Sequence, residues 1–231
     1  MRPLLVKILE DHYLNLIITL DVLGFLRLVA PYLLSGLPDK RDLEITPLSG
    51  TFWGTDSTEY RADGVISIRR RKDRDDFGLP LLHVEVEHAW SARLGERLEP
   101  CRRAMEEYHQ QEVLTVAIVL RGDRSGFVVE EAPFKWLRFA LPGCGAKEYL
   151  ARAEPVAWAL AARMDPGEWS PLRHKLECYR RLDAAPDLDD HLREFLERWF
   201  EVAVPLPGEE EDELDRLLES ESGYRTRHFA F

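Results

Sequence analysis

Two extended segments separated by one helical segment constrain the fold of this chain more than any other feature. Val113–Leu120 is an almost entirely apolar run, which predicts a strand buried on both faces. Leu81–Glu87 is also extended, and the residues from Ser91 to Gln110 between the two segments have helical spacing. A strand, a helix and a buried strand in this order predict a βαβ crossover with parallel strands.

The helical segment of this unit has one apolar stripe and one residue that disfavours a helix. The stripe consists of Leu94, Leu98, Cys101, Met105 and Tyr108. Pro100 lacks a backbone donor and its ring clashes with the preceding turn. We therefore expect a break in the helix near Glu99.

The neighbouring segments extend the sheet. Arg61–Ile68 alternates as a strand does and is expected to form a hairpin with Leu81–Glu87, with a long basic tip between them. Residues 43–53 predict a strand or an irregular edge, and residues 127–139 predict further strands. The sheet is therefore expected to be mixed.

Helices are expected at both ends of the chain. Apolar residues at helical spacing predict one or two helices within residues 11–34, and the composition becomes helical from Ala146 onward. We expect an α/β fold in which residues 1–145 form a mixed central sheet flanked by helices. Residues 146–231 would form a helical C-terminal extension with an acidic tail.

Charge and composition limit the functional classes. The net charge is −11, but residues 201–231 hold nine acidic residues against three arginines, so the first 200 residues carry only −5. Residues 61–103 hold ten basic against eight acidic residues, so this region could face DNA. No apolar run reaches the length of about 18 residues that crosses a bilayer, and no export signal is evident, so a cytoplasmic protein is expected.

The residues that suggest chemistry lie on the strand from Leu81 to Glu87. The strand period of two places His83, Glu85 and Glu87 on one face. Hairpin pairing can bring Asp63 next to Glu85, and oxygen ligands select Mg²⁺ or Mn²⁺. The plain alternative is a strand whose polar face only meets solvent, as in an unrelated α/β protein.

Several segments resemble the PD-(D/E)XK nuclease superfamily, and most closely its branch of recombination-promoting (Rpn-like) nucleases and related transposase proteins. The resemblance covers about the first 200 residues. Its core lies in residues 60–66, 82–87 and 116–120, and further likeness lies in residues 25–31 and 155–160.

This resemblance implies a restriction-endonuclease-like fold and a metal-dependent DNA endonuclease, linked to recombination or mobile elements. Asp63 and Glu85 would be metal ligands, with the backbone carbonyl of Val86 as a third, and Mg²⁺ or Mn²⁺ the cofactor. The superfamily has Lys two residues after the second acid and this branch usually has Gln, whereas this chain has Glu87. Glu87 would then act as a catalytic base or as a further ligand.

The expected partner is DNA, and a homodimer is compatible with this interpretation. Arg70 and Arg71 at the hairpin tip, and Arg93 and Arg97 on the following helix, are candidates for phosphate contacts, although solvated charges are the ordinary alternative. A second hypothesis is a weakened nuclease fold that binds nucleic acid or a protein partner without cleaving. Metal dependence of any cleavage distinguishes the two hypotheses.

Cysteine spacing gives no metal motif in the sequence. Cys101, Cys144 and Cys178 are too far apart for a zinc knuckle and odd in number, so we expect reduced thiols. His83-x-Glu85 followed by Pro100-Cys101 resembles part of the zinc deaminase signature, but Ala104 stands where the last cysteine would be. We therefore expect no zinc site from these residues.

Overall fold

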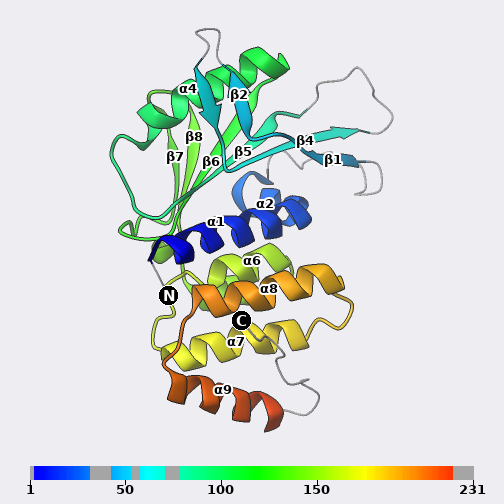
Figure 1. Ribbon diagram of the computed structural model, residues 1–231, viewed down its shortest axis with the longest axis vertical. Helices are drawn as coiled ribbons and strands as arrows, with labels where there is room; N and C mark the ends of the chain where they lie inside the picture. Colours follow the sequence, from blue (N-terminus) through cyan, green and yellow to red (C-terminus); the bar gives the residue numbers. More distant parts are fainter. Residues whose placement is uncertain (1–2, 32–42, 54–57, 71–78, 221–231) are drawn as a thin grey trace.

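The computed structural model describes residues 3–31, 43–53, 58–70 and 79–220 (Figure 1). Its centre is a six-stranded sheet in the order β1-β4-β5-β6-β8-β7. These strands are β1 (Leu43–Pro47), β4 (Gly64–Arg70), β5 (Leu81–Glu87), β6 (Val113–Val119), β7 (Phe127–Glu130) and β8 (Trp136–Ala140). Strands β5, β6 and β8 are parallel, whereas β1, β4 and β7 pair antiparallel with their neighbours. The predicted mixed α/β sheet is confirmed.

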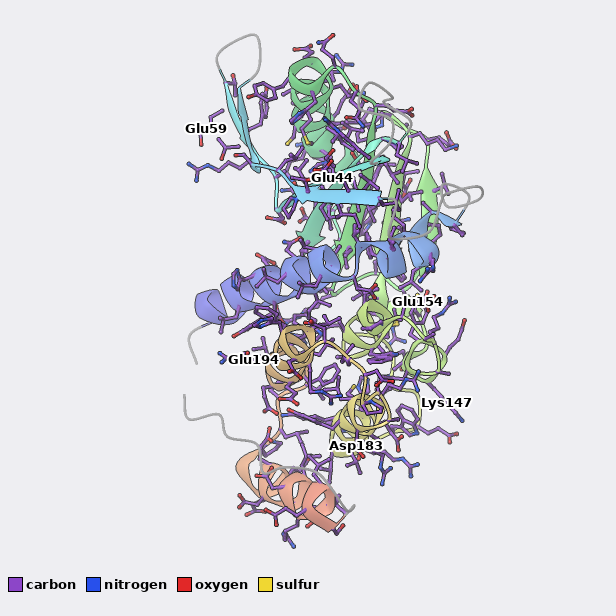
Figure 2. All side chains as sticks on the ribbon, turned by 90° about the vertical axis from the view of Figure 1, so that its right-hand side faces the viewer. Glu44, Glu59, Lys147, Glu154, Asp183 and Glu194 are labelled. Atoms are coloured by element: carbon purple, nitrogen blue, oxygen red, sulfur yellow. The ribbon has the colours of Figure 1, made fainter. Side chains whose placement is uncertain are left out.

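Helices cover both faces of this sheet. They are α1 (Pro3–Leu20), α2 (Val22–Val29), α4 (Leu94–His109), α5 (Ala146–Leu150), α6 (Pro155–Ala161), α7 (Pro171–Asp183), α8 (Asp190–Ala203) and α9 (Gly208–Ser220). Figure 1 shows α1 and α2 between the sheet and the stacked helices α6 to α9. In the perpendicular view of Figure 2, Glu44 and Glu59 lie on the sheet side of α1, and Lys147 and Asp183 lie on the helical side.

The predicted crossover through α4 is present. Strands β5 and β6 pair in parallel from Leu81 with Val113 to Glu87 with Val119, and α4 connects them. Alternation along β5 directs Val84 into the core shared with α1 and directs Leu81 toward α4, where it packs with Met105. His83, Glu85 and Glu87 have the same parity as Leu81, so they belong to the α4 face.

The expected break at Pro100 is wrong, because α4 is continuous from Leu94 to His109. Its buried residues Leu94 and Leu98 precede Pro100, and Cys101 and Met105 follow it. Packing of both halves on the sheet therefore outweighs the hydrogen bond that proline cannot donate.

The apolar stripe of α4 is shorter than predicted. Tyr108 is 69% exposed, and its ring lies edge-on to His109 in the last turn of the helix. Met105 is therefore the last residue of the stripe that is buried.

The strand expected over Arg61–Ile68 is two strands. A short strand β3 (Glu59–Arg61) pairs with β2 (Thr51–Trp53) in a separate hairpin, and β4 begins only at Gly64. The chain changes sheets where Gly50 and Ala62 approach closely: Ala62 N donates to Gly50 O at 2.7 Å, and a Cβ on Gly50 would lie 2.4 Å from Ala62 O. This change of direction leaves Asp63 at the start of β4.

The chain from Ala146 to Ser220 forms α5 to α9, in agreement with the predicted helical extension. Its core is continuous with that of the sheet, because Leu14, Val84 and Trp199 belong to one buried cluster. The division at residue 145 stays a prediction. Among the described residues, no single helix is long and apolar enough to cross a membrane; Leu9–Leu20 and Val22–Val29 reach that length only as a pair bent by 95°.

Candidate metal centre

The candidate site lies where β5 extends past its antiparallel neighbour. The register of β4 with β5 runs only from Ile66 with Leu82 to Gly64 with Val84. Beyond it, the Asp63 side chain takes the position of a strand partner, since its Oδ2 accepts a hydrogen bond of 2.9 Å from Val86 N. The N–H and C=O of one strand residue point to the same side, so the Val86 carbonyl also faces this edge.

Asp63 and Glu85 meet at this edge. Their carboxyl groups lie close enough for the charge of Glu85 to act on Asp63. Partial burial, the charge of Glu85 and the more distant charge of Asp11 raise the pKa of Asp63 to about 7, although the Val86 N–H opposes the shift. Asp63 is exposed as a residue, but its carboxyl group is turned inward against β5. At neutral pH Asp63 therefore retains its proton for part of the time.

His83 and Cys101 lie on the buried side of Glu85. The His83 ring is fully buried, with Nε2 2.8 Å from Glu85 Oε1 and Nδ1 3.2 Å from Thr115 Oγ1. Cys101 projects from α4, and its Sγ lies within 4.8 Å of the His83 and Glu85 ligand atoms. No zinc site was expected from these residues because Ala104 replaces the last cysteine of the deaminase signature. Packing of α4 on β5 nevertheless brings the Cys101 thiol to His83 and Glu85.

Glu87 is not part of this group and has a different partner. Its carboxylate forms an ion pair with the Arg97 guanidinium of α4. Glu87 is partly buried, whereas the Arg97 side chain is 60% exposed. The Glu87 carboxylate is thus neutralised by an arginine at the surface.

The other arginines proposed to contact nucleic acid are not all placed. Arg93 precedes α4, is exposed and forms a long ion pair with Glu96. Arg70 is the last residue of β4, but its side chain lies outside the described residues, as does the whole of Arg71. Of the two arginines whose side chains are described, Arg97 is the one that lies next to a predicted site residue.

A cleft of about 460 Å³ opens beside Asp63 between α1 and the start of β4. Asp11 lies in the opposite wall, and its Oδ1 is 2.9 Å from His88 Nε2. His88 Nδ1 is in turn 3.0 Å from Glu10, which is almost fully buried and paired with Arg163. Glu10 and His88 belong to no motif in the sequence, and only the fold brings them together.

The oxygen atoms at the open edge suit a hard divalent cation. Carboxylates from Asp63 and Glu85 and the carbonyl of Val86 are the donor types that Mg²⁺ and Mn²⁺ take. A cation there would relieve the repulsion that raises the pKa of Asp63. The residues present therefore fit such an ion.

Comparison of the sequence with models of protein families and with curated proteins, and of the structure with solved structures, finds no match. The functional argument is therefore based on the geometry of the site.

Proposed function

We propose that this chain is a metal-dependent DNA endonuclease with a restriction-endonuclease-like core, and that Asp63, Glu85 and the Val86 carbonyl hold Mg²⁺ or Mn²⁺. One observation carries the proposal. Burial and the neighbouring charge of Glu85 raise the pKa of Asp63, and within the described part of the chain neither acid has an ion pair with Lys or Arg. Acids placed together without a compensating cation are costly, which supports a site that a metal completes.

The remaining groups would hold these ligands in place. His83 contacts Glu85 and is itself anchored by Thr115, so the Glu85 carboxylate is restricted on its buried side. The Val86 N–H restricts Asp63. When bound, Mg²⁺ or Mn²⁺ would neutralise charge on a phosphate and lower the pKa of a bound water. The protein contributes ligands fixed before the substrate arrives.

Arg97 offers the positive charge that Glu87 cannot. Its guanidinium reaches the end of β5 through the ion pair with Glu87 and remains largely exposed. Arg93 lies one turn earlier, at the N-terminal end of α4, where the chain arrives from β5. A phosphate next to the site would therefore meet Arg97 first.

A second function, binding of nucleic acid without cleavage, is favoured by the same ion pair. Glu87 bound to Arg97 is neither the lysine of the superfamily nor an unpaired base. A chain with this arrangement could retain the fold and the phosphate contact while turning over poorly. The two functions differ in whether addition of the cation leads to cleavage of DNA or only to binding of the cation by the protein.

Nicking of supercoiled plasmid DNA tests the proposal. We expect nicking by the wild type with Mg²⁺ or Mn²⁺ and none with a chelator. Asp63→Asn and Glu85→Gln should each lower the rate by about a hundredfold or more, since the cation supplies several kcal/mol. Glu99→Gln is the matched control, because Glu99 also pairs with an arginine on α4 but lies away from Asp63.

Glu87→Gln and Glu87→Lys separate the two roles of that residue. Both variants should raise nicking if the ion pair with Arg97 limits turnover, and both should lower it if Glu87 acts as the base. Nicking that persists in chelator or in Glu85→Gln would contradict the proposed function. DNA binding without nicking in any of the variants would favour the second function.

A further inference from the structure

A second set of metal donors lies on the α4 side of Glu85. His83, Glu85 and Cys101 offer an imidazole nitrogen, a carboxylate oxygen and a sulfur, all within 4.8 Å of one another. All three residues are buried, and the Glu85 side chain retains 10% exposure. An ion can therefore reach the group along Glu85, from the open edge of the sheet.

The chemistry of this set differs from that of the open edge. Thiolate and imidazole are ligands that Zn²⁺ prefers, whereas Mg²⁺ and Mn²⁺ take oxygen. Tetrahedral bonds of about 2.0 Å to N or O and 2.3 Å to S would place the donors about 3.3–3.6 Å apart. The observed separations are 2.8 Å between His83 Nε2 and Glu85 Oε1 and at most 4.8 Å overall. Movements of about 1 Å would form the site.

Thr115 fixes the histidine in a suitable orientation. When Nδ1 carries the ring proton, it donates to Thr115 Oγ1 across the 3.2 Å contact. Nε2 then presents a lone pair toward Glu85 and Cys101. Metal-binding histidines commonly use their second nitrogen in this way, and the partner raises the affinity for the metal.

We propose that His83, Glu85 and Cys101 form a Zn²⁺ site with one further position for water. Binding forms a bond from zinc to the Cys101 sulfur, and the thiol proton passes to solvent. Three protein ligands and an open position are the arrangement of zinc sites that retain exchangeable water. The proposal is independent of DNA cleavage, because it concerns the binding of zinc to the protein alone.

Zinc titration of the reduced, metal-free protein tests the site. The wild type and Cys144→Ser should each bind one Zn²⁺. Cys101→Ser should lower the affinity for Zn²⁺ by about tenfold or more. Cys144 is the matched control, since it lies beyond β8, away from β5. Co²⁺ in place of Zn²⁺ should give a thiolate charge-transfer band in the wild type and in Cys144→Ser, but not in Cys101→Ser.

Two further measurements keep the test decisive if Cys101→Ser does not fold. X-ray absorption at the zinc edge of the wild type should show one sulfur at about 2.3 Å. Thr115→Val should weaken zinc binding by about tenfold, and Thr115→Ser should restore it, because only a hydroxyl orients His83.

The zinc site and the open-edge site share Glu85 but differ in their other ligands. Asp63→Asn should therefore leave zinc affinity within a few-fold of the wild type, whereas Glu85→Gln should weaken it. A zinc shell without sulfur, or zinc affinity unchanged by both Cys101→Ser and Thr115→Val, would overturn the proposal. His83 and Glu85 would then be a structural hydrogen-bonded pair only. A failure to nick DNA would not affect the test of the zinc site, since the zinc measurements contain no DNA.

Discussion

Two of the regions in which this protein withdraws acidic side chains from water treat those side chains differently. Between the C-terminal helices, Glu201 and Glu211 both contact the fully buried Lys175, at 2.7 and 2.6 Å. At the open edge of the sheet, Asp63 and Glu85 contact each other, and among the described residues no Lys or Arg pairs with either. The first group holds its own lysine, whereas the second, within the described residues, has only the His83 imidazole beside Glu85.

This difference separates a structural role from a ligand-binding role. Lys175 joins α7 to α8 and α9, and Tyr179 adds a hydroxyl donor to Glu201, so the charges hold three helices together. At the sheet edge, burial and the neighbouring charge of Glu85 instead raise the pKa of Asp63. Removing a group should therefore be harmful in the helices and tolerated, in the absence of metal, at the edge.

The largest effect is expected for Lys175→Met. It removes the buried cation that Glu201 and Glu211 share, which should lower the free energy of unfolding by about 3 kcal/mol. This is the lower end of the usual range, because both carboxylates retain contact with water. Lys147→Met, at an exposed position, should change stability by less than about 0.5 kcal/mol. Urea denaturation measures both, and equal effects would remove the distinction between the regions.

A smaller effect on stability, and a gain instead of a loss, is expected for Asp63→Asn without metal. The folded-state pKa of Asp63 is about 7 against an ordinary value of 3.8, so the folded protein binds the proton more tightly. The associated stability is present below pH 3.8 and is lost as the pH rises through 7. Asp63→Asn removes this loss, so it should gain stability relative to the wild type between pH 4 and pH 8. Thermal melts across this range would contradict us if the variant lost stability instead.

The smallest effect should come from His174 in α7. Burial lowers its pKa from 6.5, although the hydrogen bond from Nε2 to Ala161 O at 3.0 Å favours the charged form. At low pH His174 therefore binds a proton more readily in the unfolded chain than in the folded chain. The free energy of unfolding falls as the pH drops below 6.5. His174→Gln should reduce this fall, while His191→Gln, at an exposed position, should not. Identical acid profiles for all three proteins would contradict the prediction.

Much of the sheet could be predicted from local sequence. The alternation in Leu81–Glu87 and the apolar run after α4 were enough to predict two parallel strands. Strand period and burial both show in the pattern of adjacent residues along the chain. The split at Asp63 and the continuity of α4 through Pro100 could not be predicted. Both depend on contacts with distant segments, namely Gly50 against Ala62 and the helix against the sheet.

The candidate site divides in the same way. Asp63, Glu85 and Glu87 were recognised because they belong to short motifs. The thiol of Cys101, the Thr115 hydroxyl and the Arg97 ion pair join them only when α4 and β6 pack against β5. Cysteine spacing along the chain predicted no metal group, since it does not register a ligand set assembled from a strand and a helix.

Binding of Mn²⁺ to the protein without DNA tests the central claim most directly. Electron paramagnetic resonance of free Mn²⁺ should show one ion bound by the wild type, and Asp63→Asn and Glu85→Gln should each weaken binding by about tenfold or more. Glu211→Gln, which removes an acid from the compensated cluster around Lys175, should bind Mn²⁺ as the wild type does. Wild-type protein that binds no Mn²⁺, or that binds it equally well without Asp63 and Glu85, would contradict the account.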